Sequence, residues 1–587
     1  MLNMDIFAII TLLGGLAFFL YGMNILSSGL ERMAGGKLES ILKKMTSNPF
    51  KSLLLGMGIT AAIQSSSAMT VMLVGLVNSG IMSLNQTVGV IMGSNIGTTI
   101  TAWILSLVGI EGDNILMNLL KPKNFSLLFA FIGILMIMMS KKPKKKDIGS
   151  ILVGFAILMF GMETMSGAVK PLAEEPSFQN ILTAFKNPLL GVAFGAIFTA
   201  VIQSSSASVG ILQALAAHGG ITFGMAIPII MGQNIGTCIT SIISSIGVSR
   251  NAKKVSIVHI TFNLIGTTVC LSAFYITNAI LDLTFVDTSI SPLWIAIVHS
   301  IFNIVTTLLL LPFSKQLVKI ANWVLKDKDG DTDTKQETEL LDDRILVTPS
   351  IAIAECENAT NRLAEIAKQA LDLAIDASKD YTEEKLAEIV KLEDVTDKYE
   401  DKLGTYLVKI SSKTLSNDDS KKVSKMLHAI GDFERLGDHA VNIVKVAQEL
   451  HEKKLSFSEH AQKELAVLTS ALSEILELTI DAYNNNSIET AKKVEPLEQV
   501  IDQLVATIKV SHIQRLQAGS CSIEMGFILS DLLNNYSRVS DHCSNVAVAI
   551  IEIAHNAFDT HKYLNNVKYS SSSFNDIYEN FNAKYYL

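Results

Sequence analysis

Charged residues and cysteines are both scarce in this chain of 587 residues. Asp, Glu, Lys and Arg make up 18% of it, against 49% hydrophobic residues, and the mean hydropathy is +0.37. The five cysteines form no CxxC pair, so neither a disulfide framework nor a thiolate metal site is indicated. The net charge of −8 is modest and gives no reason to expect nucleic acid as a partner.

Two common enzyme motifs are missing as well. The sequence contains no G-x-x-x-x-G-K-[ST] phosphate loop and no zinc-binding H-E-x-x-H. The string AGGKLES at Ala34 contains Gly-Lys but lacks the spacing of the phosphate loop. We therefore do not expect an enzyme, and no catalytic residue is assigned.

Hydrophobic residues are concentrated in the first half of the chain. Charges are sparse up to about residue 313, whereas Lys, Glu and Asp are frequent from residue 326 onward. Such a break predicts an integral membrane domain followed by a soluble one. The first apolar stretch follows no basic residue, so we interpret it as a membrane segment and not as a cleaved signal. The predicted parts are a transmembrane domain at 1–315, a linker at 316–344, a helical domain at 345–560 and a tail at 561–587.

The membrane half is duplicated. The string QSSSA stands at Gln64–Ala68 and again at Gln203–Ala207, 139 positions later (203 minus 64). A constant offset over several matches is unlikely to arise by chance. We therefore predict two repeats at about 6–140 and 147–281, plus an unpaired span at 292–312. The same offset relates four further pairs: NIGT at Asn95 and Asn234, Asn48-Pro49 and Asn187-Pro188, Tyr21-Gly22-Met23 and Phe160-Gly161-Met162, and Gly80 and Gly219.

Basic residues predict how the repeats cross the membrane. If each QSSSA region is a re-entrant hairpin, each repeat crosses three times and the second copy is inverted. Basic clusters such as Lys141–Lys146 and Arg250–Lys254 then share one side with the C-terminal domain, as the positive-inside rule requires. If these regions crossed fully, the KKPKKK loop at Lys141–Lys146 and the C-terminal domain would fall on opposite faces. The sequence thus predicts an all-α polytopic membrane protein of two inverted repeats with helical hairpins, N-terminus outside and C-terminal domain cytoplasmic.

Polar strings at membrane depth need a reason, because unpaired polar groups in hydrocarbon are costly. Broken helices offer free N–H groups to an anion and free carbonyls to a small cation, typically at the midplane of inverted-repeat transporters. The alternative is that these small polar residues only join helices, as Ser and Thr commonly do. We favour the binding site, because helix packing does not require the same string in both halves.

The paired QSSSA strings, each followed by G[SQ]NIGT, resemble the type II sodium-dependent phosphate cotransporter family over about residues 1–315. In that family the duplicated hairpins carry phosphate and sodium. The resemblance implies sodium as coupling ion and inorganic phosphate as substrate, without dividing the residues between them. The substrate and sodium residues that it implies are Gln64, Ser65, Ser66, Ser67, Gln203, Ser204, Ser205 and Ser206, with Asn95, Thr98, Asn234 and Thr237 lining the site.

The soluble half is also duplicated and is expected to be helical. Its heptad-like patterns contain almost no Gly or Pro between Ser350 and His555. Glu393-x-x-x-Asp397 recurs 105 positions later, and ERLGDHAVNIV at Glu434 recurs 103 positions later as SRVSDHCSNVA. We predict two three-helix bundles in tandem.

These strings resemble the PhoU family of phosphate-signalling regulators over about residues 345–560. There, E-x-x-x-D carboxylates collect metal ions, and positions i and i+4 share one helix face. The resemblance implies a divalent or iron-type metal. Ser537 replaces an acid in the second half, and a polar seam with Arg435 and Arg538 is an equal alternative. The implied ligands are Glu393, Asp397, Glu434, Asp438, Glu498, Asp502 and Asp541.

Taken together, the sequence predicts a secondary transporter in the bacterial cell membrane that takes up phosphate with sodium, regulated by its cytoplasmic domain. Two alternatives stay open: a phosphate-signalling regulator with a non-transporting membrane scaffold, and a carrier of another small anion. Expected partners are phosphate, sodium and membrane lipid, with a second copy of the chain or a signalling protein through the PhoU-like domain left open.

Overall fold

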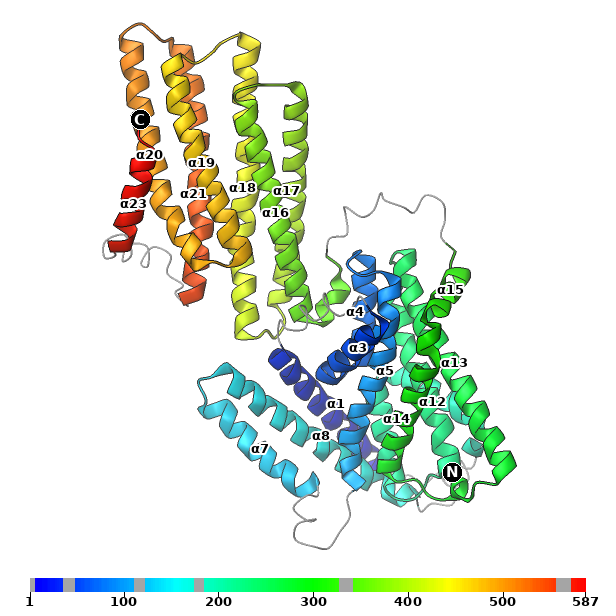
Figure 1. Cartoon of the computed structure of the whole chain (residues 1–587). Coiled ribbons are helices and arrows are strands. Elements are labelled where there is room, and N and C mark those ends of the chain that lie inside the picture. Colours follow the sequence, from blue (N-terminus) through cyan, green and yellow to red (C-terminus); the bar gives the residue numbers. More distant parts are fainter. Residues whose placement is uncertain (1–5, 35–47, 110–121, 174–183, 327–340, 556–571) are drawn as a thin grey trace. The chain divides into compact units, whose positions relative to one another are not determined.

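A computed structural model describes residues 6–34, 48–109, 122–173, 184–326, 341–555 and 572–587 (Figure 1). The described residues are almost entirely helical, and they contain no strand beyond one isolated bridge between Thr222 and Ser289. The chain forms two compact units, described separately below. The first comprises Met1–Ala352 with Thr414–Ser416, and the second comprises Ile353–Lys413 with Asn417–Leu587. Much of the predicted linker (327–340) and the start of the predicted tail (561–571) lie outside the described residues.

The helices of the first unit follow the predicted duplication. An offset of 139 carries the starts of α3, α4 and α5 onto those of α10, α11 and α12. Two helices, α14 (Pro292–Leu310) and α15 (Ser314–Val324), follow the repeats. The first repeat contains α1 (Ile6–Ala34), α3 (Pro49–Ile63), α4 (Ser66–Asn78), α5 (Leu84–Ser106) and α7 (Pro122–Met139); the second contains α8 (Pro143–Ala173), α10 (Pro188–Ile202), α11 (Ser205–Ala216), α12 (Phe223–Ser244) and α13 (Arg250–Leu281).

The first helices of the two repeats, α1 and α8, pack against each other through matching glycines. A Cβ atom on Gly22 would lie 2.3 Å from the backbone nitrogen of Leu158, and one on Gly161 would lie 2.3 Å from that of Phe19. The offset of 139 exchanges these two contacts, which is the signature of a pseudo-two-fold axis.

These two helices run antiparallel. As the contact point moves along α1 from Gly15 to Gly29, its partner on α8 moves back from Met165 to Ile151. The second repeat is therefore inverted relative to the first, as predicted.

Helix lengths separate spans from hairpins. Six helical stretches are long and apolar enough to cross a membrane by length and composition: Phe7–Met33, Leu84–Ser106, Pro143–Lys170, Phe223–Ser244, Arg250–Leu281 and Pro292–Val324. Helices α3, α4, α10 and α11, which flank the QSSSA strings, have 12 to 15 residues each. Since a span needs about 20 residues, none of these four helices is long enough to cross alone, and the predicted fold with helical hairpins is confirmed. Asn124–Met139 of α7, the last predicted crossing of the first repeat, also belongs to the shorter apolar helices.

The pseudo-symmetry ends at the last helix of each repeat. Helix α7 packs mainly along α8, whereas its counterpart α13 packs on α4, α5, α12, α14 and α15. The reason is visible in the chain order, because α7 leads directly into the long helix α8 while α13 is followed by the unpaired α14. The centre of the unit thus receives a helix from the second repeat that the first repeat does not supply.

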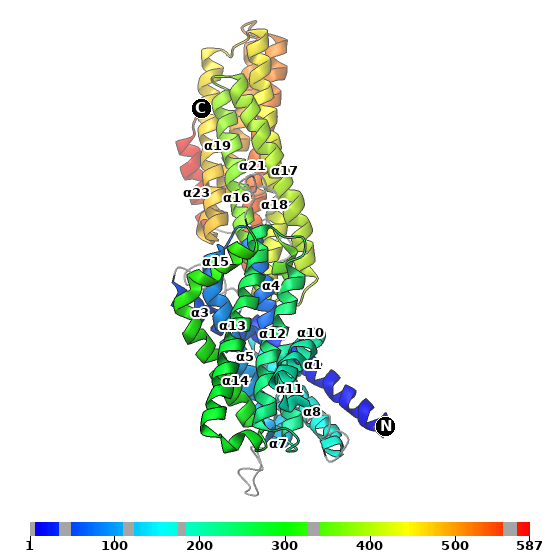
Figure 2. The same ribbon diagram turned by 90° about the vertical axis from the view of Figure 1, so that its right-hand side faces the viewer.

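The second unit consists of two successive three-helix bundles, as predicted. The six long helices run alongside one another (Figures 1 and 2), and α23 (Ser572–Lys584) lies against α20. The first bundle contains α16 (Pro349–Ala377), α17 (Glu383–Ser411) and α18 (Asn417–Lys453), and the second contains α19 (Glu459–Asn485), α20 (Ile488–Gln517) and α21 (Ile523–His555).

The two bundles meet where α18 packs on α21. Nδ1 of His542 lies 2.8 Å from Asp432 Oδ1, and Nδ1 of His439 lies 2.8 Å from Asn535 Oδ1. An offset of 103 exchanges these two pairs, so this unit has its own pseudo-two-fold relation.

Candidate functional site

Each QSSSA string is a break between two helices, and the two breaks have the same backbone geometry. Helix α3 ends in Gln64 with φ 58° and ψ 24°, and α10 ends in Gln203 with φ 57° and ψ 22°. Both glutamines are left-handed, a conformation that costs a side chain other than glycine about 1–2 kcal/mol. Such strain persists only where the surroundings fix it, and it is concentrated at functional sites.

The first serine of each string starts the next helix. Ser65 is extended and its Oγ accepts from the backbone N–H of Ala68 at 3.1 Å; Ser204 does the same for Ala207 at 3.2 Å. These two hydroxyls are N-caps, which satisfy one of the free donors of a helix start. The first turns of α4 and α11 therefore point their remaining N–H groups and positive dipole ends at the breaks, as anion sites do.

The NIGT helices lie unusually close to the hairpins because of glycine. A Cβ atom on Gly93 of α5 would lie 1.9 Å from the carbonyl oxygen of Leu53 in α3, and one on Gly232 of α12 would lie 2.1 Å from that of Val192 in α10. Only glycine fits at such distances. Along the same contact, Gly97 of the NIGT string lies against Met57 and Thr60, about one turn before the break, and Gly236 lies against Ala196 and Thr199.

The two repeats also meet directly at the breaks. Helix α4 packs against α12, and α11 packs against α5, so each hairpin touches the NIGT helix of the opposite repeat. Thr240 of α12 donates to Ser67 Oγ at 3.3 Å. Within the first repeat, the equivalent Thr101 donates to Oε1 of Gln64 at 2.8 Å.

The predicted NIGT residues are buried, and most bond within their own repeat. Thr98 and Thr237 donate to carbonyl oxygens one turn earlier, Ser94 and Gln233, both at 3.0 Å. The asparagines differ between the repeats. Asn95 donates to Oδ1 of Asn263 in α13 at 2.9 Å, whereas Asn234 donates to a carbonyl of its own helix.

Exposure also differs between the strings. Ser66, Ser205 and Ser206 are buried, as is Gln64, whereas Gln203 is exposed. Ser67 makes a hydroxyl contact across the repeats, to Thr240. The two strings thus differ in exposure and in their contacts.

Several residues of this site were missed by sequence reasoning. Thr101 and Thr240 hold the strings, and Thr60 and Thr199 donate to serine hydroxyls at 2.8 and 2.9 Å. Both pairs are separated by 139 positions, so the repeat offset would have found them. Asn263 carries no such signal, because its role depends on where α13 packs.

Five of the helices that flank the breaks carry no charged side chain. Helices α4, α5, α10, α11 and α12 contain no Asp, Glu, Lys or Arg. A neutral set of hydroxyls, amides and helix starts can bind an anion without a fixed counter-charge, and its oxygens can bind a small cation.

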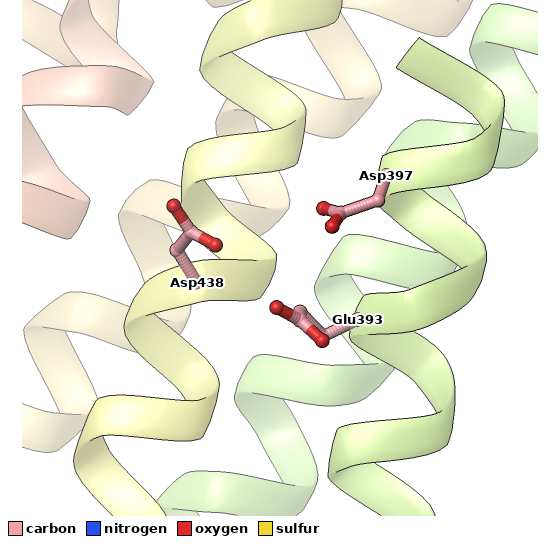
Figure 3. A group of neighbouring side chains, drawn as sticks. All are labelled: Glu393, Asp397 and Asp438. Atoms are coloured by element: carbon pink, nitrogen blue, oxygen red, sulfur yellow. The ribbon is translucent and has the colours of Figure 1, made fainter. Parts of the chain in front are cut away.

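The second unit brings two groups of carboxylates together. In the first group, Glu393 and Asp397 on α17 face Asp438 on α18 (Figure 3), and one oxygen from each lies within 4.8 Å of the others. In the second group Glu498, Asp502 and Asp541 meet the same criterion. Hard cations prefer such oxygen ligands.

Burial and mutual repulsion act on these acids. Burial, and then repulsion from Asp397 and Asp438, raises the pKa of Glu393. Burial, and then repulsion from Asp438, raises the pKa of Asp397. In the second group, burial followed by Asp502 raises the pKa of Asp541. A bound cation would relieve this repulsion.

Glu434 is not part of the first group. Its carboxylate lies 3.6 Å from Nε of Arg435, and Ser537, which replaces it in the second bundle, donates to Asp502 at 3.2 Å. The replacement therefore removes no member of the second group. Arg435 and Arg538 also pair with Asp438 and Asp541, both at 3.3 Å, so the polar seam and the carboxylate groups coexist.

Known protein families match both halves of the chain. The Na+/Pi-cotransporter family model matches residues 18–167 and 157–293, and the PhoU domain model matches 360–447 and 467–550. YjbB of Salmonella typhimurium is 23% identical over 92% of this chain and 97% of YjbB. Its name assigns it, provisionally, to inorganic phosphate export. YqeW of Bacillus subtilis is 30% identical over 53% of this chain and 96% of YqeW. Sodium-dependent phosphate transport protein 2A of Rattus norvegicus is 38% identical over 100 residues, 16% of each chain.

Proposed function

Because this chain belongs to the Na+/Pi-cotransporter family and carries a PhoU domain, we propose that it is a secondary transporter that couples the movement of inorganic phosphate to sodium. The observation that carries the proposal is the pair of identical left-handed glutamine breaks, Gln64 and Gln203, in inverted repeats. A helix start at each break suits an anion, as in other inverted-repeat carriers.

The proposed substrate and sodium site consists of the two QSSS strings with Asn95, Thr98, Asn234 and Thr237. Phosphate would occupy the helix starts and the free serine hydroxyls, since its oxygens accept hydrogen bonds from both. Sodium would use carbonyl and hydroxyl oxygens, because a hard cation prefers oxygen ligands. Since α4, α5, α10, α11 and α12 carry no charged side chain, sodium would offset the charge of the bound anion in a low-dielectric interior.

We place the protein in the bacterial cell membrane, with the N-terminus outside and the PhoU-like domain in the cytoplasm, on the distribution of basic residues. A symporter of this kind runs along the combined gradients of its substrates, so an inward sodium gradient drives uptake. Export is a second candidate direction, favoured by the name of YjbB, which aligns with nearly the whole chain.

The PhoU-like unit is proposed to regulate transport, with metal bound at its two carboxylate groups. These would be Glu393, Asp397 and Asp438 in the first bundle and Glu498, Asp502 and Asp541 in the second. In each group an i, i+4 pair on one helix faces a third acid on another, a geometry that gathers several oxygens for a hard cation.

Flux of radiolabelled phosphate in proteoliposomes tests the transport proposal. We expect accumulation that requires an inward sodium gradient and is lost in Ser66→Ala and Gln203→Ala, while Thr268→Ala, an exposed hydroxyl on α13, behaves like wild type. Reversing the gradients distinguishes uptake from export. No sodium-dependent flux in either direction would leave the signalling regulator, and competition by sulfate or succinate would indicate a carrier of other anions.

A further inference from the structure

The short segment Asp342–Thr348 is built into the first unit, although it directly precedes the first long helix of the PhoU-like half. Its core is the 3-10 helix η5 (Asp343–Val347), which packs on α4. Ile345 is fully buried, with no accessible surface. A connection that served only as a tether would not bury an isoleucine.

One side of the segment holds the hairpin of the first repeat. Nδ2 of Asn78, the last residue of α4, donates to Oδ2 of Asp342 at 2.8 Å. Ile345 packs over Gly75, where a Cβ atom would lie 3.0 Å from its Cγ1. Helix α4 has 13 residues and begins at the QSSSA break, so these contacts lie at its opposite end.

The other side holds the second repeat. Nε of Arg344 donates to the carbonyl of Ser244 at 2.7 Å, and a terminal nitrogen donates to that of Ile246 at 2.9 Å. Ser244 is the last residue of α12, where carbonyls have no partner within the helix, and a guanidinium fork suits two such acceptors. Arg344 also forms an ion pair with Asp342 at 3.0 Å.

Asn78 also connects the two repeats. Its Oδ1 accepts from the backbone N–H of Ser249 at 2.8 Å, in the turn between α12 and α13, while its Nδ2 bonds Asp342. The ends of α4 and α12 are therefore joined by a continuous series of polar contacts through Asp342 and Arg344. These are the two helices that Ser67 and Thr240 join at the break.

We propose that Asp342–Ile345 is a clasp that restrains α4 against α12, and that the PhoU-like domain regulates transport by holding or releasing it. The regulatory part rests on the proposed transport function. Alternating access requires one repeat to move relative to the other, and a contact that bridges both repeats opposes that motion. The clasp is four residues from α16, so tension or release in the PhoU-like half reaches it through a short length of chain.

Limited trypsin digestion of the full-length purified protein tests the clasp without any transport assay. Trypsin should cleave the peptide bond after Arg344 slowly while the segment is docked. We expect cleavage there to be at least tenfold faster in Asn78→Ala, which removes the bonds from Asn78 to Asp342 and Ser249 but keeps the arginine. The variant R344K keeps a trypsin site and loses the fork, so it should behave likewise. Asn322→Ala, exposed on α15, is the matched control and should resemble wild type. Equal cleavage in all four proteins would overturn the clasp.

Phosphate flux in proteoliposomes tests the regulatory role. We expect Asn78→Ala to transport at least threefold faster than wild type. Faster cleavage after Arg344 with unchanged flux would show a clasp that regulates nothing and would overturn the proposal. Absence of flux in wild type would overturn the transport function instead, and the digestion result would then decide whether the clasp exists.

Discussion

The hydroxyl oxygens of Ser67 and Thr240 lie 3.3 Å apart, although 173 residues separate them and they belong to opposite repeats. Ser67 stands in the first turn of α4, directly after the break, and Thr240 stands near the end of α12. One hydrogen bond therefore joins the hairpin of one repeat to the NIGT helix of the other. A transporter that moves its repeats would make or break this contact in each cycle.

A double-mutant cycle at this pair tests that role. Ser67→Ala and Thr240→Val should each reduce sodium-driven phosphate flux up to about tenfold, since a neutral hydrogen bond is worth about 0.5–1.5 kcal/mol. Because both remove the same bond, the double variant should lose little more than either single one. Additive losses would contradict a shared function of the two hydroxyls.

The left-handed glutamines allow backbone strain to be separated from side-chain chemistry. Glycine adopts a φ of 58° without strain, so Gln64→Gly should raise the free energy of unfolding by about 1 kcal/mol. Loss of the hydrogen bond from Thr101 subtracts from this gain, so thermal stability in detergent should stay the same or rise. Transport should nevertheless be lost, because the amide is missing. Gln64→Ala should lose transport and keep the strain. If Gln64→Gly transports phosphate normally, the glutamine is needed for the turn alone.

Close contact between the NIGT helices and the hairpins predicts an intolerance to alanine. Gly93→Ala should prevent correct packing or destabilise the protein by about 1–3 kcal/mol, because its Cβ would overlap the Leu53 carbonyl at 1.9 Å. Gly232→Ala should do the same in the second repeat. Gly58→Ala is the matched control, since nothing lies within 4 Å of its added Cβ. Thermal melting monitored by size-exclusion chromatography measures the difference; equal melting of Gly93→Ala and Gly58→Ala would refute the packing argument.

The sequence predicted most of the fold because duplication leaves a constant offset, and that offset reappears in the start of every hairpin helix. It also predicted the QSSSA breaks, since Gly, Pro and polar residues interrupt apolar runs there. It did not predict which repeat supplies the last central helix. Both α7 and α13 are the last apolar stretch of a repeat, and the sequence does not say what each of them packs on. Asn263 and Arg344 were not predicted for the same reason, because both act through contacts with segments distant in the chain.

The carboxylate groups of the second unit make a prediction about pH. The pKa of Glu393 and that of Asp397 are raised in the folded chain, so their ionisation opposes folding. In the absence of metal, this contribution to stability is most favourable below the ordinary carboxyl pKa, about 4, and is lost as pH rises through the raised values. A bound divalent cation should reverse the trend above that range.

Asp397→Asn should therefore slow hydrogen exchange of α17 in EDTA at neutral pH, because like charges at i, i+4 cost about 0.2–0.5 kcal/mol. The same variant should lose the protection that added Mn²⁺ gives to wild type. Glu388→Gln, an exposed residue of the same helix outside the group, should keep that protection. If Mn²⁺ protects Asp397→Asn and wild type equally, the group is a polar seam and holds no metal.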